Sequence, residues 1–485
     1  MNKIIRYYQN LNKAIKASIW FLICSFMQKG ISTITTPIFT RLMSVAEYGQ
    51  YSVFNSWLGI VTIFVSLHLY SGTYTQGLIK YSEDKKVYIS ALEGLLLSIV
   101  ASWTVIYLLF RTQWNRLFQL TTVQMLAMLV LIWTTSVFNF WAAEQRVNFE
   151  YRKLVLITIA VSLAKPVVGI FFVKNADDKV TARILGLALV ELMGYTSLFL
   201  VQMAHGKTFF SKKYWKHALL LNLPLVPHYL SETVLNSSDR LMINAMIGAE
   251  AAGIYSLAYS ISQIMTLFNK ALSQTVSPWI FQKIKGNSIG DIDKISIPLL
   301  GMIAIFNLAL IAFAPEIVAI FAPSNYHEAI WVIPPIAMSV YFMFMYSLFS
   351  TVEFYFEKTK WIAAATMVGA ILNIILNYLL IPVFGYCAAG YTTLVCYMVY
   401  AICHYMFMRK ICDEYLSGNN VFNIGRICIL TIAFGIVGFT FLMLYNNILI
   451  RYALVGLLII MVAVFRKKIM CIANQFMGIR KMTRN

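Results

Sequence analysis

Charged residues are scarce in this 485-residue sequence, and acidic residues are the scarcest of them. Only 12% of the residues are charged, with 20 Asp and Glu against 39 Lys and Arg, whereas 60% are hydrophobic. Soluble domains have about half apolar and about a quarter charged residues. No stretch is long and polar enough to form a separate soluble domain. This composition excludes an ordinary soluble protein and predicts an integral membrane protein.

Motifs for catalysis or metal binding are also missing from the sequence. The seven cysteines lie in or beside apolar stretches, so neither a disulfide framework nor a zinc site is indicated. There is no phosphate-binding Gly-Lys-Ser loop, no HExxH pair and no nucleophile elbow, and the six histidines are scattered. We therefore predict that the chain is not an enzyme and has no catalytic residue, cofactor or metal.

Apolar stretches of the length that crosses a bilayer recur along the whole chain. A helix needs about 20 apolar residues to span the hydrocarbon core. The pattern predicts an all-α membrane protein with about fourteen transmembrane helices. The expected spans are 17–39, 52–76, 88–110, 120–141, 153–173, 180–202, 218–247, 252–280, 295–321, 329–351, 359–382, 386–408, 424–446 and 447–466.

Basic residues are concentrated on one side of these spans. With the N-terminus inside, 27 Lys and Arg lie in the ends and loops on that side and 6 in the opposite loops. Cytoplasmic loops are enriched in Lys and Arg, so we expect both termini to be cytoplasmic. This asymmetry accounts for the net charge of +19 without nucleic-acid binding, and it favours contact with anionic membrane lipids.

The two halves of the sequence share short matching segments. Gly49, Tyr51 and Ser52 match three residues that lie 204 positions later, in the hairpin 246–256, and Gly186 matches Gly390 at the same offset. An offset of six spans predicts two parallel six-helix halves, an architecture used by transporters. The expected division is an N-terminal half 1–202, a basic cytoplasmic linker 203–217, a C-terminal half 218–412, and two extra helices with a basic tail, 413–485.

Ionisable residues within the spans are the main candidates for function, because a charge inside a membrane normally faces a cavity or a partner. We expect four cations to bind an anionic group: Lys29, Lys165, Arg240 and Lys270. Three acids are candidates for ion coupling or gating: Glu191, Glu232 and Asp239. Glu93, near the inner end of its span, is expected to reach the interface.

The cations also admit a structural interpretation, in which a neighbouring acid neutralises each of them. Lys29 lies on a stripe of polar residues that repeats at helical spacing, and Lys165 precedes Pro166, which can bend its helix. Lys270 lies on a similar stripe in the second half. These faces predict a polar cleft shared by the two halves, with Lys29, Lys165 and Lys270 near the midplane.

Three segments resemble a known family: TPIFTRLMSVAEYGQYSVF (36–54), SSDRLMINAMIGAEAAGIYS (237–256) and IPVFGYCAAGYTTLVCY (381–397). Together they are similar to the polysaccharide transporters of the multidrug/oligosaccharidyl-lipid/polysaccharide exporter superfamily, the flippases of O-antigen and capsule repeat units. The matching residues are Pro37, Arg41, Glu47, Gly49, Tyr51, Ser238, Asp239, Arg240, Gly248, Gly253 and Tyr255. In the third segment, Cys387 stands where many relatives have glycine.

The resemblance implies a flippase of the bacterial inner membrane. It implies that the cargo is an oligosaccharide linked to undecaprenyl pyrophosphate, for O-antigen, capsule or exopolysaccharide synthesis. The two parallel halves predict that the cargo moves by alternating access. The polymerase and chain-length machinery would then be partners. A multidrug and toxin extrusion antiporter and a lipid II flippase are the alternative transporters. A membrane polymerase, a glycan ligase or a nonenzymatic scaffold represents other classes of function.

Overall fold

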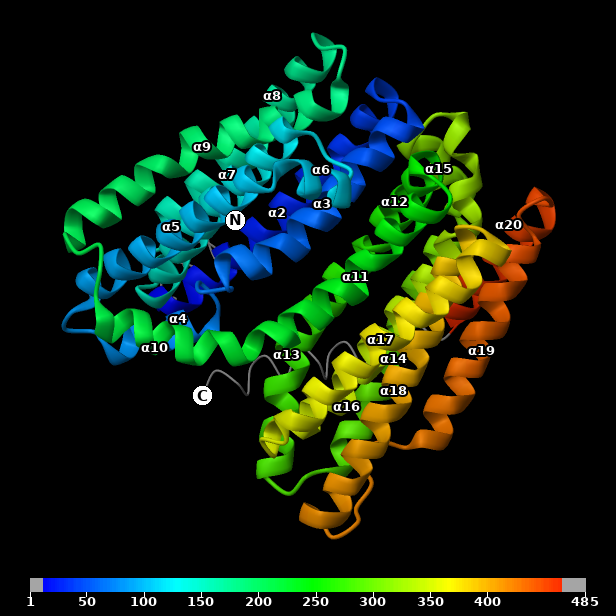
Figure 1. Cartoon of the computed structure of the whole chain (residues 1–485). Coiled ribbons are helices and arrows are strands. Elements are labelled where there is room, and N and C mark those ends of the chain that lie inside the picture. Colours follow the sequence, from blue (N-terminus) through cyan, green and yellow to red (C-terminus); the bar gives the residue numbers. More distant parts are fainter. Residues whose placement is uncertain (1–11, 465–485) are drawn as a thin grey trace, which may run out of the picture. The chain divides into compact units, whose positions relative to one another are not determined.

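The computed structural model describes residues 12–464, and within that range the chain forms helices and no strand (Figure 1). The α-helices are α2 (Lys13–Leu42), α3 (Val45–Ser66), α4 (Gly72–Lys80), α5 (Lys85–Leu109), α6 (Arg111–Phe118), α7 (Thr122–Val147), α8 (Tyr151–Lys174), α9 (Lys179–Gly206), α10 (Lys212–Asn222), α11 (Val226–Met246), α12 (Ala249–Ser262), α13 (Ile264–Lys285), α14 (Gly290–Ala312), α15 (Ala314–Phe321), α16 (Ile333–Tyr355), α17 (Thr359–Phe384), α18 (Cys387–Tyr415), α19 (Ile424–Met443) and α20 (Ile448–Val464). Two 3₁₀ helices, η1 (Leu223–Leu225) and η2 (Ser324–Trp331), complete the described elements. The all-α membrane fold predicted from the composition is confirmed.

Eleven helical segments in the described part of the chain are long and apolar enough to cross a membrane, and one of them, Ala249–Lys285, comprises α12 and α13. The other three of the fourteen predicted spans coincide with α3, α11 and α20. Helix α11 carries Glu232, Asp239 and Arg240, and the apolar part of α20 is the shorter segment Ile448–Ile460. The number fourteen therefore remains a prediction for these three helices.

The chain divides into two compact units, residues 1–241 and 242–485. In the N-terminal unit, α9 packs against α7, α8 and α5, and α2 packs against α8. Gly186 of α9 allows this packing, because a Cβ there would lie 3.2 Å from the Cα of Gly169 in α8. On the outer surface of the same helices, the apolar side chains of Val167, Phe171 and Met193 are exposed, as expected for groups that face lipid.

The first family-like segment forms the tight connection between α2 and α3. Ser44 caps α3: its hydroxyl accepts a hydrogen bond from the Glu47 N–H at 3.2 Å, and the Glu47 carboxylate accepts one from the Ser44 N–H at 2.7 Å. This reciprocal pair satisfies two donors at the helix start. The predicted span 52–76 is not continuous, because Leu67 and His68 adopt left-handed conformations and separate α3 from α4.

In the C-terminal unit, the central helix is α16, which packs against α18, α14 and α13. The turn between α11 and α12 uses Gly248, whose φ of 131° is unfavourable for residues with a side chain. The predicted span 252–280 consists of two helices, α12 and α13, which meet at Gln263. Helix α19 packs on α14, so the two extra helices belong to this unit.

Candidate functional site

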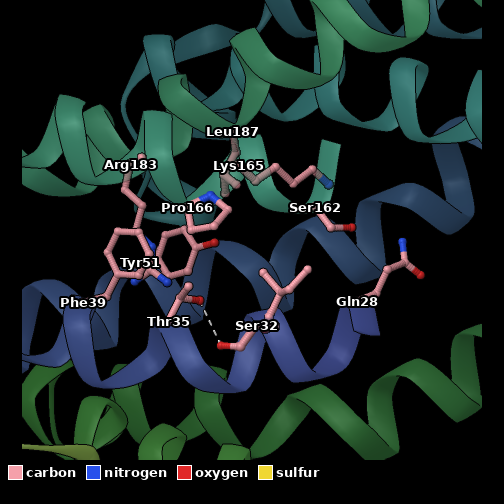
Figure 2. A pocket seen from close by; sticks show the side chains of 12 residues that line it. Gln28, Ser32, Thr35, Phe39, Tyr51, Ser162, Lys165, Pro166, Arg183 and Leu187 are labelled. Carbon is pink, nitrogen blue, oxygen red and sulfur yellow. Dashed lines mark hydrogen bonds between the residues drawn. The ribbon is translucent and has the colours of Figure 1, made fainter. Parts of the chain in front are cut away.

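A polar cavity of about 280 Å³ lies within the N-terminal unit, between α2, α3, α8 and α9 (Figure 2). Its volume is close to the lower end of the range of about 300–1,000 Å³ that is typical of small-molecule pockets. It therefore suits one group of a cargo rather than a whole oligosaccharide. The lining residues are Gln28, Ile31, Ser32, Thr35, Phe39, Tyr51, Ser162, Lys165, Pro166, Gly169, Arg183 and Leu187.

The sequence explains why the wall of this cavity is polar. Gln28, Ser32, Thr35 and Phe39 follow one another at intervals of four, three and four, which places them on one face of α2. In α8, Pro166 has no N–H to donate to the carbonyl of Ser162, four residues earlier. Both the Ser162 side chain and the proline line the cavity, so polar groups are available here at membrane depth.

Lys165 and Glu191 form an ion pair at the cavity wall. The Lys165 Nζ donates to Glu191 Oε1 at 2.6 Å, and the side chains are 31% and 7% exposed. The hydroxyls of Thr134 and Thr135 each donate to Glu191 Oε2 at 2.8 Å. Both oxygens of the Glu191 carboxylate are therefore hydrogen-bonded, one to the ammonium group of Lys165 and the other to the two threonine hydroxyls. Two residues predicted for different roles, cargo binding and coupling, are neighbours in the fold.

Arg183 also lines the cavity, although no sequence pattern indicated it as a site residue. Its guanidinium carbon lies 3.8 Å from the ring centre of Phe39 and 3.6 Å from that of Tyr51. Figure 2 shows Arg183 beside these two rings, while the Lys165 chain extends toward the other end of the cavity. Arg183 lies in the first turns of α9, close to the expected membrane–water interface. Charged residues are common at that depth, so its position in the sequence gave no sign of a functional role.

Lys29 and Arg240 also belong to the N-terminal unit but are not among the residues that line this cavity. Lys29 follows Gln28 on α2 and is half-buried. Arg240 is half-buried on α11, where one guanidinium nitrogen donates to the Asn236 carbonyl at 2.7 Å. Their predicted contact with an anionic cargo remains a proposal.

The other predicted residues differ strongly in exposure. Lys270 on α13 and Glu232 on α11 are exposed, whereas Asp239 is buried. Near Lys270, the hydroxyls of Ser273 and Ser277 lie 3.4 Å and 3.1 Å from hydroxyl groups of α16. These two serine hydroxyls of α13 therefore contribute to the packing of α13 against α16.

The expectation for Glu93 was wrong, because its side chain is fully buried among the helices of the N-terminal unit. Neither carboxylate oxygen has a hydrogen-bond partner in the described part of the protein. Another buried acid, Glu353 of α16, was missed because it lies just beyond the end of the predicted span 329–351. Its Oε1 is 2.8 Å from Nδ1 of His404 on α18, and both side chains are 0% exposed. No sequence spacing indicated this pair.

The cavity offers hydroxyl, amide and cationic groups for binding rather than a set of residues for catalysis. Within residues 12–464, no group of three or more His, Cys, Asp and Glu residues is placed to hold a metal ion. Hydroxyls and amides replace the hydration of sugar groups, and cations replace that of an oxyanion. The arrangement therefore fits the binding of a polar or anionic group inside a membrane protein.

Several solved transporters have the same fold. A lipid II flippase, MurJ, in an inward-closed conformation matches with a TM-score of 0.70 and 16% identity over 93% of this chain and all of that chain. An inward-facing multidrug resistance transporter of the MATE family matches with a TM-score of 0.62 and 12% identity over 81% of this chain and 96% of that one. These similarities show that the chain has the fold of this transporter superfamily.

Sequence comparison identifies a relative and a matching family. The chain is 20% identical to Lsg locus protein 1 of Haemophilus influenzae over 386 residues, 75% of this chain and 90% of that protein. The model of the polysaccharide biosynthesis protein family matches residues 14–283, more than half of the 485 residues. The chain therefore belongs to the polysaccharide biosynthesis protein family.

Proposed function

We propose that the chain is a flippase that moves undecaprenyl-pyrophosphate-linked oligosaccharide repeat units across the bacterial inner membrane. The cargo serves O-antigen, capsule or exopolysaccharide synthesis. The observation that carries the proposal is the polar cavity with Lys165 and Arg183 in a unit whose outer surface is apolar. Family membership and the transporter fold support the same function.

The energetics of the cargo explain why such a cavity is needed. Sugar hydroxyls and a diphosphate lose their hydration when they enter an apolar core, which is strongly unfavourable unless other polar groups replace the water. The hydroxyls of Ser32, Thr35, Tyr51 and Ser162 can replace water around sugars. The apolar carrier chain needs no such compensation, so it can remain in contact with lipid.

The mechanism that we propose is alternating access, in which the polar head group is exposed first to the cytoplasm and then to the outer side. Lys29, Lys165, Arg240 and Lys270 would contact anionic groups of the cargo in this cycle. Glu191, Glu232 and Asp239 would contribute to coupling or gating. Because Glu191 holds Lys165 in an ion pair, its first effect is to set the charge that Lys165 presents to the cargo.

A conditional deletion in the native host tests this proposal. We expect lipid-linked repeat units to accumulate on the cytoplasmic leaflet and the surface polysaccharide to disappear, and a plasmid copy of the gene to reverse both effects. The matched control is Arg116→Gln, which removes a charge at an exposed position outside the cavity and should complement fully.

Other outcomes would indicate other functions. Normal surface polysaccharide together with altered drug sensitivity would favour a multidrug antiporter. Accumulation of lipid II together with defects in the cell wall would favour a lipid II flippase. Either result would contradict the proposed function.

A further inference from the structure

Arg183 occupies an unusual position in the cavity wall, between two aromatic rings. The guanidinium carbon is within 4 Å of the ring centres of both Phe39 and Tyr51. Such contacts place the faces of the planar guanidinium against the rings and hold the group in a fixed orientation. The N–H groups lie in the plane at its edges, so the rings do not use them as donors.

The donors of Arg183 have few partners in the protein. The only hydrogen bond of its guanidinium among the described residues is to the sulfur of Met43, at 3.6 Å, and thioether sulfur is a weak acceptor. No ion pair links Arg183 to a carboxylate within residues 12–464. The side chain therefore presents N–H groups and a positive charge that the described residues do not neutralise.

The second cation of the cavity differs in this respect. Lys165 is paired with Glu191 at 2.6 Å, so the two groups together contribute no net charge to the cavity wall. Arg183 thus supplies the net positive charge among the lining residues. An anion that enters the cavity meets a neutralised cation at Lys165 and a charged donor group at Arg183.

We propose that Arg183 binds an oxyanion of the cargo, with its orientation fixed by Phe39 and Tyr51. The oxyanion is either a phosphate oxygen of the carrier or the carboxylate of an acidic sugar, since a guanidinium forms paired hydrogen bonds with both. This inference rests on the proposed function and names the residue that selects an anionic group. It also assigns the stronger anion contact in this cavity to Arg183 rather than to Lys165.

The position of Arg183 along the helices fits this role. Arg183 lies four residues after the start of α9, about 6 Å along the helix axis, whereas Lys165 lies nine residues before the end of α8, about 14 Å from it. These two helix ends are joined by the short turn at residues 175–178. The cavity therefore extends from the middle of the unit toward this turn, with the uncompensated charge near the turn.

The test uses the full chain in lipid nanodiscs with three polyprenyl probes that share a chain length. The first is a diphosphate-linked neutral disaccharide, the second is the same disaccharide linked without phosphate, and the third is the second with a glucuronate in place of one sugar. Binding is measured for the unmodified chain, Arg183→Gln, Arg183→Lys and the surface control Arg116→Gln. The melting temperature of each variant verifies that it is folded.

We expect Arg183→Gln to weaken binding of at least one anionic probe by about tenfold or more, since a hydrogen bond to a charged group has that effect. Binding of the uncharged probe should change less than about twofold, because neutral groups do not need this cation. Arg183→Lys should retain part of the affinity. A loss for the diphosphate probe identifies the carrier as the oxyanion source, and a loss for the glucuronate probe identifies the sugar.

Two results would overturn the inference. If Arg183→Gln changes the affinity for all three probes equally, Arg183 only holds the helices together. If it leaves the affinity for both anionic probes unchanged, Arg183 does not bind the oxyanion. If Arg183→Gln is too unstable to purify, Arg183→Lys and Arg183→Met are compared instead, and equal affinities of these two for the anionic probes would overturn it. If the unmodified chain binds none of the lipid-linked probes, the proposed function fails as well. Binding by the unmodified chain with no effect of the Arg183 substitutions would contradict this inference alone.

Discussion

The ion pair of Lys165 and Glu191 allows a double-substitution test that separates stability from transport. Lys165→Met leaves the Glu191 carboxylate, 7% exposed, with only the hydroxyls of Thr134 and Thr135 as donors. Breaking a buried pair from one side is destabilising by about 3–5 kcal/mol. Because Lys165 is 31% exposed, we expect a value at the lower end, about 3 kcal/mol.

Glu191→Gln should have a smaller effect, because the remaining ammonium group of Lys165 can reach a polar environment. We expect a loss of about 1 kcal/mol, the upper value for solvent-accessible pairs. The double variant Lys165→Met/Glu191→Gln contains neither charge, so its loss should be smaller than the sum of the single losses by about 2 kcal/mol. The assay is thermal unfolding of the purified chain, measured through tryptophan fluorescence, with Arg116→Gln as the control.

Surface polysaccharide measured in the same variants addresses the role of Lys165. If Lys165 contributes to cargo passage, the double variant should be folded and still export less polysaccharide than the unmodified chain. Full export by the double variant would show that the pair is structural. If the loss of stability in the double variant equals the sum of the two single losses, Lys165 and Glu191 do not stabilise each other, which would refute the role of the ion pair.

Three further predictions concern packing around the cavity and two other pairs of side chains. Gly169→Leu should displace Phe39, because even a Cβ at this position would lie 3.2 Å from the Phe39 ring. We expect about 1–3 kcal/mol of destabilisation and reduced export. Gly30→Ala is the neutral control, because a Cβ at Gly30 meets nothing within 4 Å. Arg451→Met removes the buried partner of a carboxylate in α15, so hydrogen exchange in α20 should become faster, and unchanged exchange would argue against this contact. Glu353→Leu should lower stability by about 1–3 kcal/mol, because it leaves Nδ1 of the buried histidine without its partner; an unchanged melting temperature would contradict the importance of the pair.

The sequence was sufficient to predict the fold class because apolar content and span length determine it directly. The family-like segment 36–54 was also informative, since Ser44 and Glu47 form the cap that starts α3. Helix breaks were harder to predict. Leu67 and His68 end α3 through left-handed conformations, which are uncommon for residues other than glycine and which no turn motif in the sequence indicated.

The site was predicted in part. Lys165 and Glu191 were recognised as charges inside spans, but their pairing depends on the packing of α8 against α9, which sequence spacing does not specify. Arg183 was overlooked because its place near the end of a span made a border position the simpler interpretation. Its significance comes from Phe39 and Tyr51, which are more than 130 residues away in the sequence.

Transport in proteoliposomes is the most direct test of the proposed flippase activity. The purified chain is reconstituted in vesicles that contain an undecaprenyl-diphosphate-linked oligosaccharide, and an added glycosidase cleaves only the cargo exposed on the outer leaflet. With the unmodified chain, we expect the protected half of the cargo to become accessible, whereas protein-free vesicles should keep it protected. Protection that is equal with and without the folded chain, tested also with an imposed ion gradient and membrane potential, would contradict the account.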